Sequence, residues 1–400
     1  MARRGSGSKS KQRGALSIFT ALAIFVLIGF VGLAIDTARV YTIHDELQSA
    51  VDSCALAGAL ELNGGTDAAT RATAIGRFVA AKNSANLQSA AVAIPESGVT
   101  FSSTLRGNFV PATSISGANA SYVRCRAQLT GISAYLMSVL GVGDVDLAAS
   151  ATAAAAPAQT VCSLPMALCA GNKGGTGNVF GYKAGEKAEL GATSSSGFFT
   201  WADVINTTPV SGLQPYADAL AGGGTCGVRT STGRCIGIQT GVVASLDDAW
   251  NARFGAYKSN GLSPTEAVPD LSGYGYRGGN SPAKGWIEDY LSVRVPARTP
   301  NQLSLPNSYK VIPDVNKTYG APYRRLSIMP VVECGSNACG KSSKPISGWA
   351  CVLMLAVKTS SQNAEIEIVA RADDPASPCR ASGVAGGSGA MGPLVPVIVQ

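Results

Sequence analysis

Histidine is nearly absent from this chain, which has a single one, His44, among 400 residues. A Ser-His-Asp triad needs a histidine inside the folded domain, and His44 lies close to a long apolar segment, so we expect no triad. The cysteines include no CxxC pair, and zinc sites are built from such pairs or from histidines. The sequence therefore predicts no catalytic site of these kinds, no metal and no cofactor.

Charge is absent from the segment Ala15 to Ile35, a run of 21 residues. As a helix this run would cover about 30 Å, the thickness of the hydrocarbon core of a bilayer. Inside a bilayer the backbone must satisfy its own hydrogen bonds, which favours a helix. We predict a transmembrane helix here. It contains no GxxxG motif, so nothing in it supports dimerisation through the span.

Acidic residues are missing from the tail that precedes this span. Residues 1–14 carry five basic side chains: Arg3, Arg4, Lys9, Lys11 and Arg13. Basic residues beside a first membrane helix favour the cytoplasmic side, so the tail is predicted inside and the bulk of the chain outside. The tail also supplies most of the formal net charge of +7. We therefore attribute the basic composition to topology and predict no nucleic-acid partner.

Two processing alternatives compete with an uncleaved signal anchor. A cleaved signal peptide has a shorter apolar core, about 7–15 residues, which leads to a small-x-small site. Here the core runs directly into Asp36 with no good cleavage signal. A type IV pilin-like leader would be cut after Gly14, but Phe19 stands where such leaders usually have glutamate. The sequence favours the uncleaved anchor.

All ten cysteines follow the predicted span, on the side that we place outside the cytoplasm. An even number of cysteines in an oxidising compartment predicts disulfides. Six of them form close sequence pairs and four are left over. The close pairs are Cys162 and Cys169, Cys226 and Cys235, and Cys334 and Cys339; the combinations left over are Cys351 with Cys379 and Cys54 with Cys125. Spacing does not establish which cysteines bond to each other.

The predicted membrane helix continues beyond the bilayer. Apolar residues recur at spacings of three and four up to a natural stop at Gly64 and Gly65. The stripe comprises Val40, Ile43, Leu47, Ala50, Val51, Cys54 and Ala57. We favour packing of this stripe on the protein's own core over an exposed surface for helix–helix assembly.

Further elements follow along the chain. The patterns predict helices over 67–82 and 132–140, and strands within 92–105, 121–130 and 144–156. After residue 158 glycine, serine and proline become frequent, and short apolar runs at 326–332 and 346–357 predict buried strands. The second run has 12 residues, too few to cross a membrane.

These elements predict an α+β fold with one N-terminal transmembrane helix that extends into the periplasm. A mixed α/β region follows it, and then a β-rich region that contains disulfides. The predicted organisation is a basic cytoplasmic tail (1–14), the transmembrane helix (15–35), a region with a long helix and a small α+β part (36–157) and a β-rich, Cys-containing extracytoplasmic region (158–400).

One segment matches a catalytic motif in full. Residues 335–342, GSNACGKS, fit the P-loop pattern GxxxxGK[ST], in which Lys341 and Ser342 would contact phosphate and magnesium. Pro345 and Gly348 follow where a P-loop begins a helix, so we interpret the match as chance. Asp270-Leu-Ser272 similarly begins a metal-dependent adhesion motif DxSxS, but Tyr274 replaces its second serine.

The N-terminal residues resemble a known family. Four stretches carry the resemblance: Arg13-Gly14-Ala15, the apolar run, Gly32-Leu-Ala-Ile-Asp36, and Leu47-Gln48 through Ala55-Leu-Ala-Gly-Ala59. They are similar to the signature of TadG-like (TadE/TadG-like) proteins of the Tad (tight adherence) Flp pilus-assembly system. Residues 136–141 and 148–153 look like the way that the family's first region ends. Residues 162–169, 251–257, 324–334 and 348–350 look like the longer members of the family.

The resemblance implies a non-catalytic, membrane-anchored accessory or scaffold protein for the assembly of Tad/Flp (type IVc-like) pili or the associated secretion machinery. Its implied partners are the inner membrane and other Tad/Flp proteins, both pilin-like and platform components, with no small-molecule substrate. The implied location is the bacterial inner membrane, single-pass, with a cytoplasmic N-terminus and the bulk periplasmic or extracellular. An envelope-anchored surface adhesin or binding module is the alternative, and a P-loop nucleotide-binding protein is a remote one.

Overall fold

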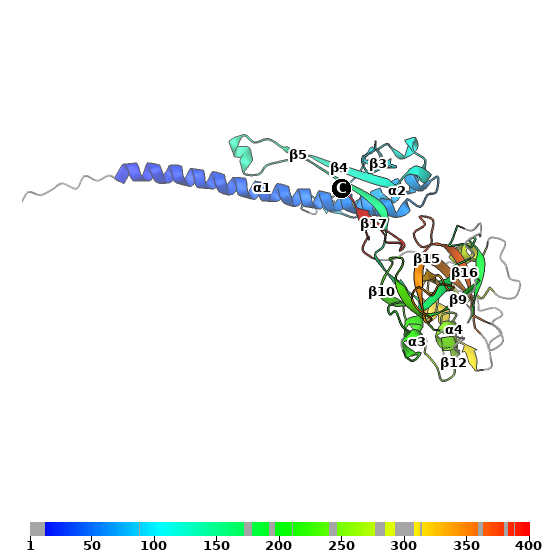
Figure 1. Ribbon diagram of the computed structural model, residues 1–400. Coiled ribbons are helices and arrows are strands. Elements are labelled where there is room, and N and C mark those ends of the chain that lie inside the picture. Colours follow the sequence, from blue (N-terminus) through cyan, green and yellow to red (C-terminus); the bar gives the residue numbers. More distant parts are fainter. Residues whose placement is uncertain are drawn as a thin grey trace, which may run out of the picture. The chain divides into compact units, whose positions relative to one another are not determined.

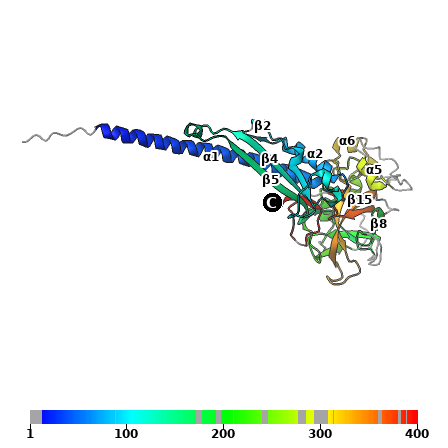
Figure 2. The ribbon, with the colours of Figure 1, turned by 90° about the horizontal axis from the view of Figure 1, so that it is seen from above.

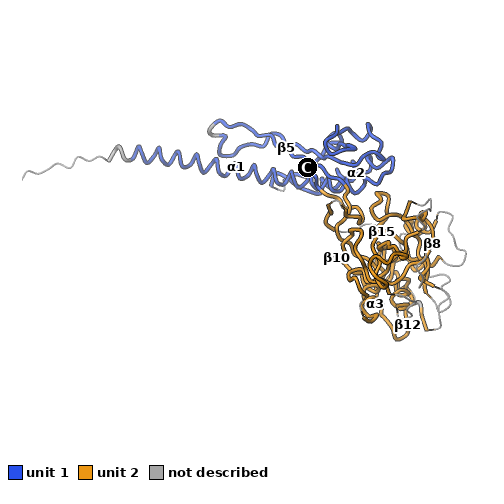
Figure 3. Tube along the Cα trace, in the orientation of Figure 1, with its two compact units in different colours: residues 1–154, 398–400 blue, residues 155–397 orange. Residues whose placement is uncertain are grey.

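The chain forms two compact units, which Figure 3 distinguishes by colour. Unit 1 comprises Met1–Ala154 with Ile398–Gln400, and unit 2 comprises Ala155–Val397. The structure, a computed structural model, describes residues 13–87, 89–171, 178–191, 197–209, 211–239, 246–276, 285–292, 308–312, 314–358, 363–379, 383–387 and 389–400. The predicted α+β class is confirmed by a long N-terminal apolar helix, strand-rich sheets and five disulfides.

Unit 1 is built on one long helix. Helix α1 (Arg13–Glu61) has 49 residues, and a loop with Gly64 at a φ of +78° leads to α2 (Ala68–Ala80). Figures 1 and 2 show α1 as a single rod with α2 against its C-terminal part. The predicted apolar stripe does pack on the core of its own unit, because Ile43, Leu47 and Val51 are fully buried there.

A four-stranded sheet, ordered β17-β5-β4-β3, lies beside this helix pair. Its strands are β3 (Val99–Ser102), β4 (Tyr122–Ile132), β5 (Val145–Pro157) and β17 (Leu394–Ile398). The smaller elements of the unit are β1 (Ser84–Ala85), β2 (Ala90–Ala91), and the 3-10 turns η1 (Glu96–Gly98), η2 (Ala112–Ser114), η3 (Gly117–Asn119) and η4 (Met137–Leu140). The backbone of Thr152 pairs with both Val399 and Gln400, so the residues at 398–400 lie at the edge of this sheet.

The helix predicted over 132–140 is wrong for most of its length. Ile132 ends strand β4, and only Met137–Leu140 form a helical turn, of the 3-10 type. Residues 122–132 pair in antiparallel register with 145–154, so they form one arm of a β4–β5 hairpin. Cross-strand pairing therefore outweighs the local helical pattern in this stretch.

Unit 2 is organised around a nine-stranded sheet, ordered β10-β6-β14-β7-β9-β11-β15-β16-β8. Its strands are β6 (Thr160–Ser163), β7 (Met166–Cys169), β8 (Glu186–Leu190), β9 (Phe198–Asp203), β10 (Thr225–Arg229), β11 (Cys235–Gln239), β14 (Leu326–Val332), β15 (Ser343–Ala356) and β16 (Glu365–Arg371). Strand β14 also pairs with β15, so β14, β7, β9, β11 and β15 form a closed circuit of pairings.

Strand β15 shows why this part of the sequence is apolar without interruption. Its side chains alternate between two buried clusters, with Ala350 and Val352 in one and Cys351 and Leu353 in the other. A strand buried on both faces has no polar face to alternate with. The predicted buried strand in residues 346–357 is thus confirmed.

Short elements complete unit 2. Its helices are α3 (Gln214–Ala221), α4 (Asp247–Ala252), α5 (Trp286–Ser292) and α6 (Val315–Tyr319), and a separate antiparallel pair consists of β12 (Ala256–Lys258) and β13 (Tyr309–Val311). Trp250 of α4 is fully buried, stacks on Phe199 and donates a hydrogen bond to the Ala356 carbonyl oxygen, 2.8 Å away. Helix α4 is therefore fixed to the sheet through one aromatic side chain.

Candidate functional site

Helix α1 changes its surroundings near residue 36. Over residues 17–61 it is long and apolar enough to cross a membrane. Twelve large apolar side chains in its first half are 46–73% exposed: Ile18, Phe19, Leu22, Ile24, Phe25, Val26, Leu27, Ile28, Phe30, Val31, Leu33 and Ile35. From Ile43 onward the stripe positions up to Cys54 are instead buried in unit 1. One unbroken helix thus joins a mostly exposed apolar half to a packed half.

Asp36 marks the boundary between the two halves and anchors the tip of the β4–β5 hairpin. Its carboxylate accepts hydrogen bonds from three consecutive backbone N–H groups, those of Tyr135 (3.2 Å), Leu136 (2.9 Å) and Met137 (2.7 Å). These groups open the 3-10 turn η4, so Asp36 caps that turn from another element. The Met137 bond contributes most to lowering the pKa of Asp36, because it stabilises the charged carboxylate.

Neighbouring contacts reinforce this junction. The Arg39 guanidinium lies 3.9 Å from the centre of the Tyr135 ring and donates a hydrogen bond to the Ser133 carbonyl oxygen, 2.7 Å away. A Cβ atom added at Gly32 would lie 3.1 Å from the Leu136 Cβ, so the hairpin tip packs closely against α1. The junction therefore fixes the tip next to the last turn of the apolar half.

The comparison with known families covers this part of the chain. Residues 14–74 match the family model Tad, described as "Putative Flp pilus-assembly TadE/G-like". This segment is TadE/G-like. No curated protein and no solved structure matches the chain.

The TadE/G-like segment contains the apolar half of α1, Asp36, the buried stripe and the start of α2. The resemblance expected from the sequence is confirmed over these residues, and it supports a role related to Tad/Flp pilus assembly. Families of this kind are not catalytic. The family stretches that we expect beyond residue 74 stay predictions.

The sequence gives only part of this junction. It predicts the end of the apolar run at Ile35, but it gives no sign that Asp36 binds the hairpin. The partners of Asp36 are backbone N–H groups 99–101 residues away. Such groups carry no side-chain pattern, so only the fold brings the two segments together.

The structure places all ten candidate cysteines in five disulfides. The bonds join Cys54 to Cys125, Cys162 to Cys226, Cys169 to Cys334, Cys235 to Cys339, and Cys351 to Cys379. None of the three close sequence pairs bonds internally. Instead each of these cysteines crosses to a partner on another element, as when Cys169 at the end of β7 bonds to Cys334 after β14. Within unit 1 the Cys54–Cys125 bond ties α1 to β4.

The P-loop-like segment has a different geometry from a P-loop. Strand β15 begins at Ser343, directly after the motif, where a P-loop would begin a helix. Disulfides hold Cys334 and Cys339 on either side of the turn, and the Lys344 Nζ donates a hydrogen bond to the Ser336 carbonyl oxygen, 2.7 Å away. This arrangement gives the nucleotide-binding alternative no support.

Asp270 serves as a structural acceptor in unit 2. Its carboxylate accepts hydrogen bonds from the Ser272 amide (2.7 Å), the Tyr290 hydroxyl (2.5 Å) and the Arg325 amide (3.1 Å). These donors occupy the oxygens that an adhesion-type metal would need. Among the residues that the structure describes, no group of three or more His, Cys, Asp or Glu side chains could hold a metal ion.

His44 lies on α1 with its side chain 43% exposed, 4.0 Å from the carboxylate of Asp45. This placement agrees with a solvated helix residue.

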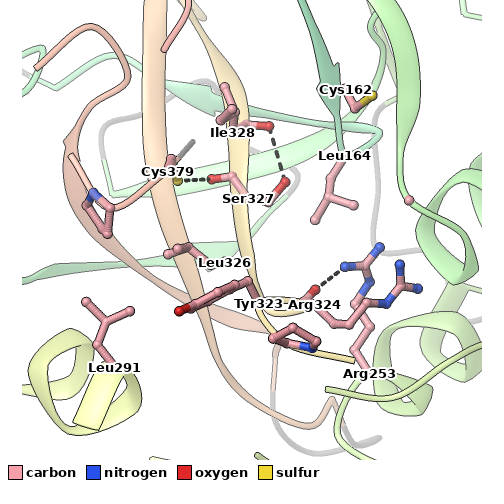
Figure 4. Close-up of a pocket in the computed structure, with 13 residues that line it drawn as sticks. Cys162, Leu164, Arg253, Leu291, Tyr323, Arg324, Leu326, Ser327, Ile328 and Cys379 are labelled. Carbon is pink, nitrogen blue, oxygen red and sulfur yellow. Dashed lines mark hydrogen bonds between the residues drawn. The ribbon is translucent and has the colours of Figure 1, made fainter. Parts of the chain in front are cut away.

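A cavity of about 610 Å³ in unit 2 has charged side chains in its wall (Figure 4). Arg253 and Arg324 line it together with Leu164, Leu326 and Ile328, and no acidic residue is among the described lining residues. Burial lowers the pKa of Arg253 to about 9, because a charged guanidinium loses hydration there.

The two arginines of this cavity are occupied by backbone carbonyl oxygens. Arg253 donates hydrogen bonds to the oxygens of Leu220 (2.8 Å), Gly222 (2.9 Å) and Arg324, and Arg324 donates to Ala221 (2.6 Å). Both side chains therefore hold the end of α3 against neighbouring segments. We assign them a structural role and place no ligand in the cavity.

Proposed function

We propose that this protein is a non-catalytic, single-pass scaffold of Tad/Flp pilus assembly, anchored in the bacterial inner membrane. The observation that carries the proposal is the continuity of α1 within the TadE/G-like segment. Its exposed apolar half and its buried half belong to one helix of 49 residues. A rigid helix would transmit the position of the membrane anchor to unit 1, and flexible tethers do not do this.

In this proposal residues 1–14 lie in the cytoplasm, Ala15 to Ile35 span the membrane, and the rest of the chain lies in the periplasm. The basic tail supports this direction, and the five disulfides fit an oxidising compartment. The proposed partners are pilin-like and platform components of the same machinery, next to the lipid-facing or unit 1 part of α1.

Topology is tested with reporters fused after Gln400. We expect alkaline phosphatase, which needs the periplasm, to be active there, and a cytoplasmic reporter at the same position to be inactive. The opposite result would overturn the proposed orientation.

Scaffolding is tested by breaking the rigidity of α1 in cells. Insertion of Gly-Ser-Gly-Ser between Ile35 and Asp36 would uncouple unit 1, together with the Asp36 junction, from the anchor without removing either. The matched control is the same insertion between Ser231 and Thr232, in the exposed turn between β10 and β11. We expect the first insertion to abolish surface pili as deletion of the gene does, and the control to keep them.

The same experiment separates the scaffold from an adhesin. An adhesin needs only a tether, so it would tolerate the insertion in α1 and would be released by protease treatment of intact cells. Normal pili and adherence after gene deletion would remove the pilus role altogether.

A further inference from the structure

We propose that the tip of the β4–β5 hairpin, residues 133–143, is a second membrane contact that lies in the headgroup region of the bilayer beside α1. This inference rests on the proposed membrane span of α1. It adds a segment about 100 residues away in sequence to the membrane surface of the protein.

The composition of the tip fits a lipid interface. No charged residue occurs from Ala127 to Gly143, and Asp144 and Asp146 end this neutral stretch. Within the tip Tyr135 is 63% exposed, Leu136 46% and Val142 42%. A hairpin tip in water normally carries polar side chains, whereas tyrosine beside aliphatic residues is typical of the membrane–water interface.

The position of the tip is set by the Asp36 junction. Asp36 directly follows Ile35, the last residue of the apolar run, and holds the amides of residues 135–137. Leu136 also packs against Gly32, one helical turn further into the run, which corresponds to a rise of about 6 Å. Figures 1 and 2 show the hairpin running beside α1 with its tip toward the N-terminal half of the helix.

The tip also meets the backbone requirement for such a location. Unpaired N–H groups are costly near hydrocarbon, and the Asp36 carboxylate pairs three of them. The tip and the adjoining turn of α1 both expose apolar side chains, such as Leu136 on the tip and Val31 and Ile35 on the helix. Lipid covers that half of α1 in the proposed topology. We therefore assign lipid as the neighbour of the tip as well. Arg39, stacked on Tyr135, then lies where lipid phosphates are found.

Tryptophan reporters in the full-length protein test this placement. The protein is reconstituted in phosphatidylethanolamine–phosphatidylglycerol vesicles whose acyl chains carry bromine near the carbonyl end in one preparation, for the tip, and near the chain end in another, for the middle of the span. The reporters are Tyr135→Trp and Val142→Trp on the tip, Phe25→Trp in the span, and Phe78→Trp on α2, where Phe78 is as exposed (60%) as Tyr135. The four native tryptophans all lie in unit 2, so the wild-type signal is subtracted.

We expect brominated lipid to quench Tyr135→Trp and Val142→Trp about twofold or more, and to leave Phe78→Trp unchanged. The inference is overturned if Phe25→Trp is quenched while both tip reporters behave like Phe78→Trp. Tip reporters that are shielded from both bromine and aqueous acrylamide would also overturn it, because another protein chain would then cover the tip. An unquenched Phe25→Trp would instead contradict the proposed membrane span.

Discussion

Unit 1 and unit 2 differ in how much covalent support their cores receive. Unit 1 has one disulfide, between α1 and β4, whereas unit 2 has four. In unit 1 the helices α1 and α2 and the strands β3, β4 and β5 pack in chain order. In unit 2 neighbours such as β6 and β14 are far apart in sequence.

The difference shows what each unit must overcome to fold. Closing a long loop during folding costs chain entropy. A disulfide that already closes the loop lowers the entropy of the unfolded chain, so less entropy is lost when the chain folds. Unit 2 also forms many of its strands from short segments between long connections. We therefore expect its stability to depend on oxidation much more than that of unit 1.

The largest effect should come from removing a long-range disulfide. Replacement of Cys169 and Cys334 by alanine opens a bond with a sequence separation of 165, and we expect it to lower the stability of unit 2 by about 4–5 kcal/mol. The measurement is calorimetry of the full chain in detergent, with one transition for each unit. Only the transition of unit 2 should move.

The matched control is Cys54→Ala with Cys125→Ala, in unit 1, where the separation is 71. It should lower the unit 1 transition by about 4 kcal/mol and leave unit 2 in place. If either pair of substitutions moves both transitions equally, the two units do not unfold independently and the comparison fails.

A smaller effect concerns pH and belongs to unit 2. Glu367 in β16 is 2% exposed, and burial raises its pKa to about 7. The folded state therefore holds this proton more tightly than the unfolded state, and stability should fall as pH rises from about 4.5 to about 7. Glu367→Gln should remove this decline and stabilise unit 2 at pH 8 by about 1–3 kcal/mol.

Thermal unfolding at pH 5 and pH 8 measures this effect. Glu365→Gln, two residues away on the same strand and paired with Lys187, serves as the control and should keep the decline. If the stability of Glu367→Gln still falls between pH 5 and pH 8, the decline comes from a group other than Glu367.

The next effect is local and belongs to unit 1. Asp36→Asn keeps the shape of the side chain but removes the charge that the three amides bind. We expect exchange of the amide hydrogens at residues 135–137 to become about tenfold faster, with the exchange of β3 unchanged. Asp52→Asn, on the same helix, is the control.

The pKa of Asp36 gives this junction a pH window. Because the folded-state pKa lies below the ordinary value of 3.8, the stabilisation is complete above pH 3.8 and declines as pH falls through the lower folded value. The measurement is the exchange rate of the amide hydrogens at residues 135–137 from pH 6 down to pH 2.5, corrected for intrinsic rates. If this rate stays constant, the charge of the carboxylate does not hold the tip.

The smallest effect is expected at Lys341, an exposed residue of the P-loop-like turn. Lys341→Ala should change the stability of unit 2 by no more than about 0.5 kcal/mol and should leave pilus formation intact. Binding of fluorescent ATP by the wild type that disappears in Lys341→Ala would restore the nucleotide-binding alternative.

Patterns within one element could be predicted from the sequence. The apolar run that becomes the first half of α1, the stripe from Ile43 to Val51 and strand β14 at 326–332 all follow from spacing or from a continuous apolar stretch. In each case the signal lies in the same residues that form the element.

Pairings between distant elements could not be predicted. Close spacing suggests that Cys334 and Cys339 are related, but the closed circuit of strands carries them to Cys169 and Cys235. The helix expected at 132–140 failed for a similar reason, because β5 and Asp36 supply hydrogen bonds that a local pattern does not contain.

The pairing of Thr152 with Val399 and Gln400 makes unit 2 an insert in the sheet of unit 1. The chain leaves unit 1 at Ala154 and re-enters it at Ile398, on adjacent strands. A turn of about two to four residues is enough to join two such strands. Residues 155–397 could therefore be excised, or exchanged for another folded module, while the membrane helix and its hairpin keep their own sheet.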